Sequence, residues 1–189
     1  MKHYINTIKL LIYFFIISFS ISLIINISFI YTPQVTFLDM YHVKTYQLLT
    51  LGMVIGPIVV LLILNKKGVY NASIFIVYLL ESSVVAMGFY NNHAIAVTAG
   101  SLALGIAITS SMIVCPILTH YLRGPVSYIK AFSSVLISYF LGFILSNPLH
   151  YTSMNTTHFN TSIIYLILLL LISFFTVFSA WKGRLVLLK

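Results

Sequence analysis

Long hydrophobic runs separated by short polar breaks constrain this chain more than any other feature of its sequence. Each run is long enough, at about 1.5 Å of rise per helical residue, to cross or nearly cross a hydrocarbon core about 30 Å thick. The runs cover residues 8–30, 45–64, 70–89, 94–119, 126–146 and 161–181. We therefore predict an all-α integral membrane protein with six transmembrane helices, in which residues 1–189 form a single bundle.

Positive charge falls in alternate breaks between these runs. Nine of the ten Lys and Arg residues lie before or at the start of the first run, in the second break, in the fourth break or at the start of the fifth run, or after the sixth run: Lys2, Lys9, Lys66, Lys67, Arg123, Lys130, Lys182, Arg184 and Lys189. Lys44 is the exception and lies in the first break. Because Lys and Arg are enriched in cytoplasmic segments, we expect both termini in the cytoplasm, which is an N-in/C-in topology.

The composition excludes a soluble domain. Hydrophobic residues make up 60% of the chain and charged residues 6%, and the mean hydropathy is +1.07, which is outside the range of soluble globular domains. In a soluble protein the net charge of +8 would indicate nucleic-acid binding, but here the cations are dispersed at helix ends on one face. The lipid bilayer, with its anionic headgroups, is the expected partner, and nucleic acid is not.

The sequence lacks the residue patterns of catalytic and metal sites. Cys115 is the single cysteine, so it can form neither a disulfide nor a thiolate pair within the chain. The histidines lie at the ends of runs, and no H-E-x-x-H, G-x-S-x-G, P-loop or dinucleotide-binding glycine pattern is present. We therefore expect no enzymatic activity, no metal and no cofactor.

Small residues at four-residue spacing predict helix-packing faces. In lipid no hydrophobic force holds helices together, so Gly, Ala and Ser must allow close backbone approach. The packing residues that we predict are Gly52 and Gly56 in the second run, Ala99, Ala103, Ala107 and Ser111 together with Gly105 in the fourth, and Ser134, Ser138 and Gly142 in the fifth. The series in the fifth run continues to Ser146, which favours a tight packing seam along that helix.

Glu81 lies near the middle of the third run, where a carboxylate is costly. Even on insertion scales the cost is at least about 2.5 kcal/mol, so we expect Glu81 to face the bundle interior or a wet cavity. A carboxylate in that position is a candidate for binding a proton or a substrate. The alternative is a protonated carboxyl group that is hydrogen-bonded to a neighbouring helix.

The second positively charged break reads Asn65-Lys66-Lys67-Gly68. It resembles the loop between helices two and three of the major facilitator superfamily, where Asp-Arg, one residue and Gly-Arg-Arg follow a glycine. Gly68 matches the second glycine, Lys66 replaces the Arg and Asn65 replaces the Asp. Further likeness to the drug:proton antiporter branch lies in Ile30-Tyr31-Thr32-Pro33 after the first run, in Gly105 of the fourth run and in Gly142 of the fifth.

This resemblance implies that the chain is the amino-terminal half of a facilitator-type two-bundle fold. It implies transport of a small organic solute or drug, with proton exchange, as in multidrug efflux antiporters of the bacterial inner membrane. Asn65, Lys66 and Gly68 would form its cytoplasmic gating loop. Because the substrate site of such transporters lies between two halves, a second six-helix half or a homodimer is the expected partner. The alternative is that the chain is a truncated, inactive remnant of such a transporter.

Two departures from the family pattern concern its charge relay. Asn65 cannot supply the anion that the loop Asp provides, and Ser101 cannot supply the cation of the helix-four Arg. Proton coupling is therefore weakened, lost or transferred to Glu81.

Two other functional classes fit the same length and helix count. One is a substrate-binding membrane subunit of an ATPase-driven transporter, and the other is an accessory subunit of a membrane complex. Co-purification with ATPase subunits would distinguish the former from a secondary transporter.

Overall fold

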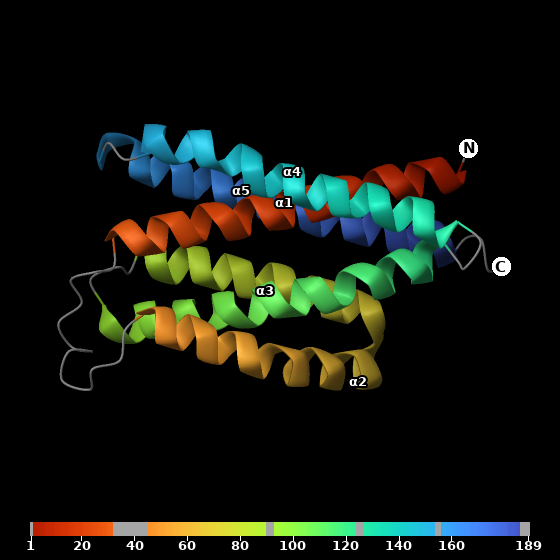
Figure 1. The fold of residues 1–189 in the computed structure, drawn as a ribbon, viewed down its shortest axis with the longest axis horizontal. Helices are drawn as coiled ribbons and strands as arrows, with labels where there is room; N and C mark the ends of the chain where they lie inside the picture. Colours follow the sequence, from red (N-terminus) through yellow and green to blue (C-terminus); the bar gives the residue numbers. More distant parts are fainter. Residues whose placement is uncertain (1, 32–44, 90–92, 124–126, 154–155, 186–189) are drawn as a thin grey trace.

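The computed structural model describes residues 2–31, 45–89, 93–123, 127–153 and 156–185 as a bundle of long α-helices that run roughly parallel to one another (Figure 1). Five helices are present in these residues. They are α1 (Lys2–Tyr31), α2 (Thr45–Gly88), α3 (Ala94–Arg123), α4 (Tyr128–Ser153) and α5 (Thr156–Leu185).

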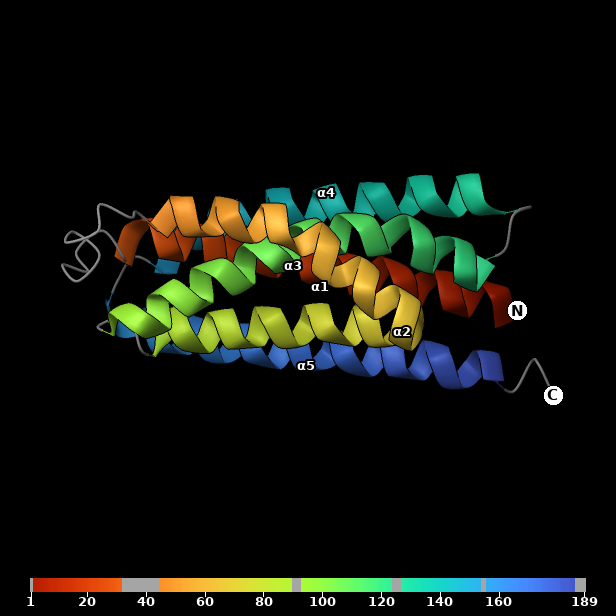
Figure 2. The same ribbon diagram turned by 90° about the horizontal axis from the view of Figure 1, so that it is seen from below.

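The second and third predicted helices form one element, α2, so the expectation of six separate helices is corrected to five. Within α2 only Gly68 departs from helical geometry, with φ 79° and ψ 174°. A positive φ is strained for residues with a Cβ and readily accessible to glycine. One residue therefore redirects the chain, and no loop separates the first arm (residues 45–67) from the second arm (residues 69–88). Figure 2 shows the two arms meeting at the bend and diverging toward the other end of the bundle.

Four helices in the described residues are long and apolar enough to cross a membrane. The apolar segments are Thr7–Asn26 in α1, Gln47–Gly88 in α2, Ile95–Leu122 in α3 and Tyr128–Ser146 in α4. The apolar part of α5, Ile164–Ser179, is shorter. These segments support a multi-pass integral membrane protein, because each can keep its backbone hydrogen bonds internal while facing lipid.

The positively charged residues of the described helices gather at one end of the bundle. The start of α1, the bend of α2, the end of α3, the start of α4 and the end of α5 all lie at that end (Figure 1). These segments carry Lys2, Lys9, Lys66, Lys67, Arg123, Lys130, Lys182 and Arg184. We call this the basic end; Lys44 lies outside the described residues.

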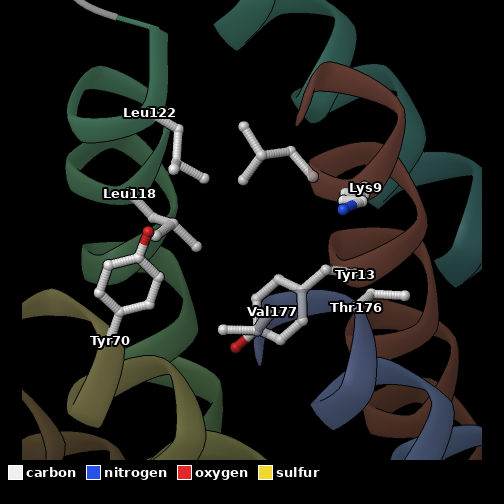
Figure 3. Close-up of a pocket in the computed structure, with 8 residues that line it drawn as sticks. Lys9, Tyr13, Tyr70, Leu118, Leu122, Thr176 and Val177 are labelled. Atoms are coloured by element: carbon white, nitrogen blue, oxygen red, sulfur yellow. The ribbon is translucent and has the colours of Figure 1, made fainter. Parts of the chain in front are cut away.

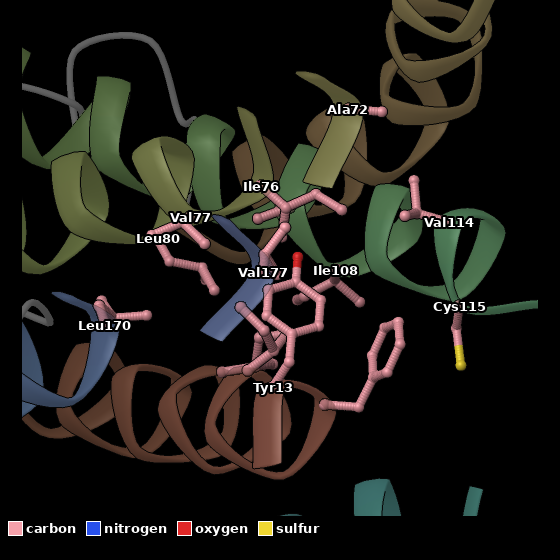
Figure 4. Packing of buried hydrophobic residues seen from close by; sticks show 14 of the residues in the cluster. Tyr13, Ala72, Ile76, Val77, Leu80, Ile108, Val114, Cys115, Leu170 and Val177 are labelled. Carbon is pink, nitrogen blue, oxygen red and sulfur yellow. The ribbon is translucent and has the colours of Figure 1, made fainter. Parts of the chain in front are cut away.

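The hydrophobic core is centred on α1. Two thirds of its apolar segment, 67%, is buried, against 22% for α4. Figure 4 shows Tyr13 of α1 among apolar side chains of α2, α3 and α5, including Ile76, Ile108 and Val177. The apolar segment of α3 is 61% buried and that of α2 17%, so α1 and α3 are the inner helices, whereas α2 and α4 lie nearer the surface of the bundle.

The first arm of α2 and α3 touch through their backbones. A Cβ added to Gly52 would lie 2.3 Å from the carbonyl oxygen of Leu102 and 3.1 Å from the Cα of Gly105. A Cβ on Gly56 would lie 2.0 Å from Oγ1 of Thr109. Only glycine permits this approach, which places the three predicted packing glycines, Gly52, Gly56 and Gly105, in one contact.

We expect Gly105→Ala to destabilise the protein. Its added Cβ would lie 2.1 Å from the carbonyl oxygen of Leu49 and 2.9 Å from the amide nitrogen of Met53, so the helices must separate, at a cost of about 1–3 kcal/mol. Thermal unfolding in mild detergent measures the change. Ala99→Val, at an exposed position of the same helix, is the control; equal midpoints for the two variants would contradict the contact.

Candidate functional site

The predicted gating segment is helical up to Lys67. Asn65, Lys66 and Lys67 form the exposed last turn of the first arm, and Gly68 follows at the bend. The side-chain amide of Asn71 donates a hydrogen bond to the carbonyl oxygen of Lys67 across the bend. Carbonyl groups at a helix end lack partners within the helix, so this bond helps to terminate the first arm.

An open groove of about 410 Å³ lies between the two arms next to the bend. Its lining residues are Leu62, Ile63, Lys66 and Lys67 from the first arm and Asn71, Ile74, Phe75 and Tyr78 from the second. The polar residues are those nearest the bend, and the apolar residues lie deeper along both arms. At the deep end the ring of Tyr78 contacts that of Phe174 in α5, with centroids 6.4 Å apart. The groove is therefore amphipathic along its length.

Glu81 does not lie in the bundle interior, which is one of the two positions expected for it. It is half-buried on the second arm, and within the part of the chain that the structure describes it makes no hydrogen bond or ion pair. The buried face of this arm carries Leu80 and Ser83, whose hydroxyl donates to the carbonyl oxygen of Gly100 in α3. Each helical residue is rotated about 100° from the last, which places Glu81 on the flank of the arm.

A small cavity of about 10 Å³ lies inside the basic end, between α1, the second arm, α3 and α5 (Figure 3). Leu118 and Leu122 of α3 and Val177 of α5 line it with Tyr13 and Tyr70. At its edge the Lys9 ammonium donates a hydrogen bond to the Ser179 hydroxyl and so links α1 to α5. This space is of the size of one water molecule, so this part of the basic end is closed to an organic solute.

Two tyrosines inside hydrophobic runs join helices through their hydroxyl groups. The hydroxyl of Tyr13 donates to the carbonyl oxygen of Ser73 at 3.0 Å, linking α1 to the second arm. The hydroxyls of Tyr139 in α4 and Ser111 in α3 lie 3.4 Å apart. The sequence analysis missed both tyrosines, although a signal was present, since an interfacial tyrosine belongs at the end of a run.

Three buried serines on α1 and α3 differ in their hydrogen bonding. Ser20 and Ser110 are fully buried, and their hydroxyl oxygens have no hydrogen-bond partner. Ser101, where the facilitator resemblance has an Arg, is also fully buried and donates to the carbonyl oxygen of Val97 in its own helix. A buried hydroxyl without a partner costs about 1–3 kcal/mol, so Ser20 and Ser110 retain unused hydrogen-bonding capacity.

The packing seam of α4 lies against α1. Ser138 donates to the carbonyl oxygen of Leu11 at 2.8 Å, and the hydroxyls of Ser146 and Ser22 lie 2.6 Å apart. Between them, a Cβ on Gly142 would lie 2.4 Å from the carbonyl oxygen of Phe15.

Ser134, the first residue of the predicted seam, does not take part in it. It is exposed and donates to Lys130 of its own helix. The described contact therefore begins one turn later, at Ser138, whose hydroxyl is the first in this series to bond to α1.

The described residues contain no group of three or more His, Cys, Asp or Glu side chains that could hold a metal ion. Cys115 is a buried free thiol. Asp39 and His42 of the first break lie outside the described residues. His93 and His120 are exposed, at opposite ends of α3.

The contacts reported above pair the helices reciprocally. The first unit consists of α1 and the two arms of α2, and the second of α3, α4 and α5. The first helix of each unit packs on the second helix of the other, since Gly142 meets α1 and Gly52 meets α3. The third helices also meet, through Tyr78 and Phe174.

No known protein family, curated protein or solved structure matches this chain. The resemblance to facilitator transporters therefore stays a prediction from the sequence.

We expect Tyr13→Phe and Tyr13→Ala to differ strongly in stability. Phe keeps the buried ring and loses one hydrogen bond, which costs about 0.6 kcal/mol on average between membrane helices. Ala also removes the ring, at about 3–5 kcal/mol. Unfolding in detergent by a mild denaturant measures both values. A loss for Phe as large as that for Ala would show that the hydroxyl contributes more than the packing.

Proposed function

We propose that residues 1–189 form one half of a secondary transporter of the major facilitator type, with six membrane passes when the two arms of α2 are counted separately. The half works with a second six-helix unit and moves a small organic solute or drug across the membrane in exchange for protons. The reciprocal pairing of the two three-helix units is the observation that carries this proposal.

The two units also run in opposite directions. α1 starts at the basic end of the bundle, and α3 starts at the other end (Figure 1). An inverted repeat requires two units that run in opposite directions and make equivalent contacts with each other. The two three-helix units meet this requirement, because the first helix of each packs on the second helix of the other. Each half of a facilitator transporter is built from such 3+3 inverted repeats, which supports the assignment.

The basic end is the cytoplasmic end in this proposal. Cationic segments are retained on the cytoplasmic side, and the described cations lie at one end. Both termini then lie in the cytoplasm, as expected for the half of a transporter in a bacterial inner membrane.

The proton carrier in this proposal is Glu81, the only acidic residue whose side chain the structure describes. At membrane depth the neutral form of a carboxyl group is favoured, and the charged form requires water or a cation. Because Glu81 is half-buried and has no protein partner among the described residues, a change in its surroundings can change its protonation. Movement of this bundle against a second one supplies such a change.

The substrate site lies between two bundles in this proposal. Facilitator transporters bind substrate near the bilayer midplane at the interface of their repeats, and alternate by rocking one bundle against the other.

We expect Glu81→Gln to abolish drug-dependent proton flux. Gln keeps the size and hydrogen-bonding groups of the side chain but cannot exchange a proton. The purified protein is reconstituted in liposomes that contain a pH-sensitive dye, and a panel of lipophilic cations is added. Wild type and the neighbouring control Ser82→Ala should carry protons, with at least about a tenfold loss in Glu81→Gln. Equal flux in all three would remove Glu81 from the mechanism.

The same preparation tests the need for a second bundle. We expect native mass spectrometry in mild detergent to show a protein mass of twice the 21.3 kDa chain, a homodimer in which a second copy supplies the other half. A monomer that carries drug-dependent flux would contradict the two-bundle proposal.

A further inference from the structure

The groove between the two arms of α2 has the size of a small-molecule site and opens on the outer surface of the bundle. Its volume of about 410 Å³ lies within the range of ligand sites, which is about 300–1,000 Å³. Its walls belong to the surface, since Leu62 is 55% exposed and Tyr78 is 59% exposed. In a membrane this surface faces lipid, so a lipid molecule reaches the groove without entering the bundle.

The mouth of the groove carries two positive charges that the described residues do not neutralise. Lys66 and Lys67 are exposed, and neither makes an ion pair with a described residue. Glu81 is the only described carboxylate, and it lies ten residues beyond Asn71 on the second arm, or about 15 Å. The amide of Asn71, which is bonded to the Lys67 carbonyl, adds a neutral polar group beside the two ammonium groups.

The apolar part of the groove follows directly from this charged mouth. Ile63 on one arm and Ile74 and Phe75 on the other line it, and the Tyr78 ring closes its deep end against Phe174. The arms run along the length of the bundle (Figure 2), so polarity falls from the basic end toward the membrane centre. A free anion would use only the mouth, whereas a phospholipid would use both parts.

We infer that this groove binds an anionic phospholipid, with its phosphate at Lys66 and Lys67 and an acyl chain along Phe75 toward Tyr78. Basic pockets between membrane helices on the cytoplasmic side bind anionic headgroups in this way. The bound lipid would bridge the two arms at the end where Gly68 alone connects them. Binding of lipid here does not require transport, although Lys66 also belongs to the predicted gating segment.

Native mass spectrometry with added phosphatidylglycerol or phosphatidylcholine tests the headgroup contact. Wild type should bind phosphatidylglycerol in preference, and the exposed double variant Lys66→Gln/Lys67→Gln should bind it about 30-fold more weakly. Lys130→Gln removes an exposed lysine at the basic end, on α4 and outside the groove. Lys130→Gln should leave the affinity for phosphatidylglycerol unchanged. The matched single variant Lys67→Gln should have an affinity between those of wild type and the double variant.

Three results of this experiment would overturn the inference. They are equal affinity for the two lipids, an equal loss in Lys130→Gln and Lys67→Gln, and full displacement of phosphatidylglycerol by millimolar inorganic phosphate. The last result would show that the mouth binds a free anion and that the apolar wall contributes nothing.

Fluorescence quenching tests the acyl-chain contact in a folded protein whose lysines are intact. Tyr78→Trp is introduced after Trp181→Phe has removed the only native tryptophan. Phosphatidylglycerol brominated on its acyl chains should quench this Trp more than brominated phosphatidylcholine at the same mole fraction. Phe140→Trp, at an exposed position of α4, should be quenched equally by both. Equal quenching at position 78 would contradict the site.

Discussion

Close approach of helix backbones at glycine is the interaction on which the rest of this bundle depends. Lipid tails are as apolar as leucine, so the helices gain little from burying apolar surface and must instead gain dispersion contacts at short range. Gly52 and Gly105 provide them between α2 and α3, and Gly142 provides them between α4 and α1. These contacts set which helices are neighbours, and the positions of the polar groups follow from them.

The bend at Gly68 is the second constraint, and it links the fold to the groove. A single residue of positive φ brings the two arms of α2 together at the basic end, while α3, held by Gly52 and Gly105, contacts both arms farther along. The arms therefore converge at one end and diverge at the other (Figure 2). Lys66 and Lys67 line the groove beside the bend because the helix continues through them. A loop was expected at these residues.

Prediction from sequence succeeded where one residue type has one physical consequence. A long apolar run must be helical in lipid, and the described cations gather at one end of the bundle as the alternating breaks indicated. It failed where the rotation of a helix about its own axis decides which neighbour a side chain faces. Glu81 was expected in the interior or in a wet cavity and lies on the flank of its arm, and Ser134 was expected in a seam that begins at Ser138. The spacing of residues along a helix identifies which of them share a face, but not whether that face contacts another helix or lipid.

By itself the sequence determined the helical class, the membrane as solvent and the placement of charge at one end, because burial in lipid penalises every unpaired backbone group and every charge. The tertiary structure alone decided which helices pair, that Tyr13 and Tyr139 connect helices, and that an amphipathic groove lies beside the bend. The physical reason is that these features depend on contacts between residues distant in the chain. A helix in lipid has several apolar faces that could pack against a neighbour with nearly equal energy, and the fit of the two backbones decides which face does so.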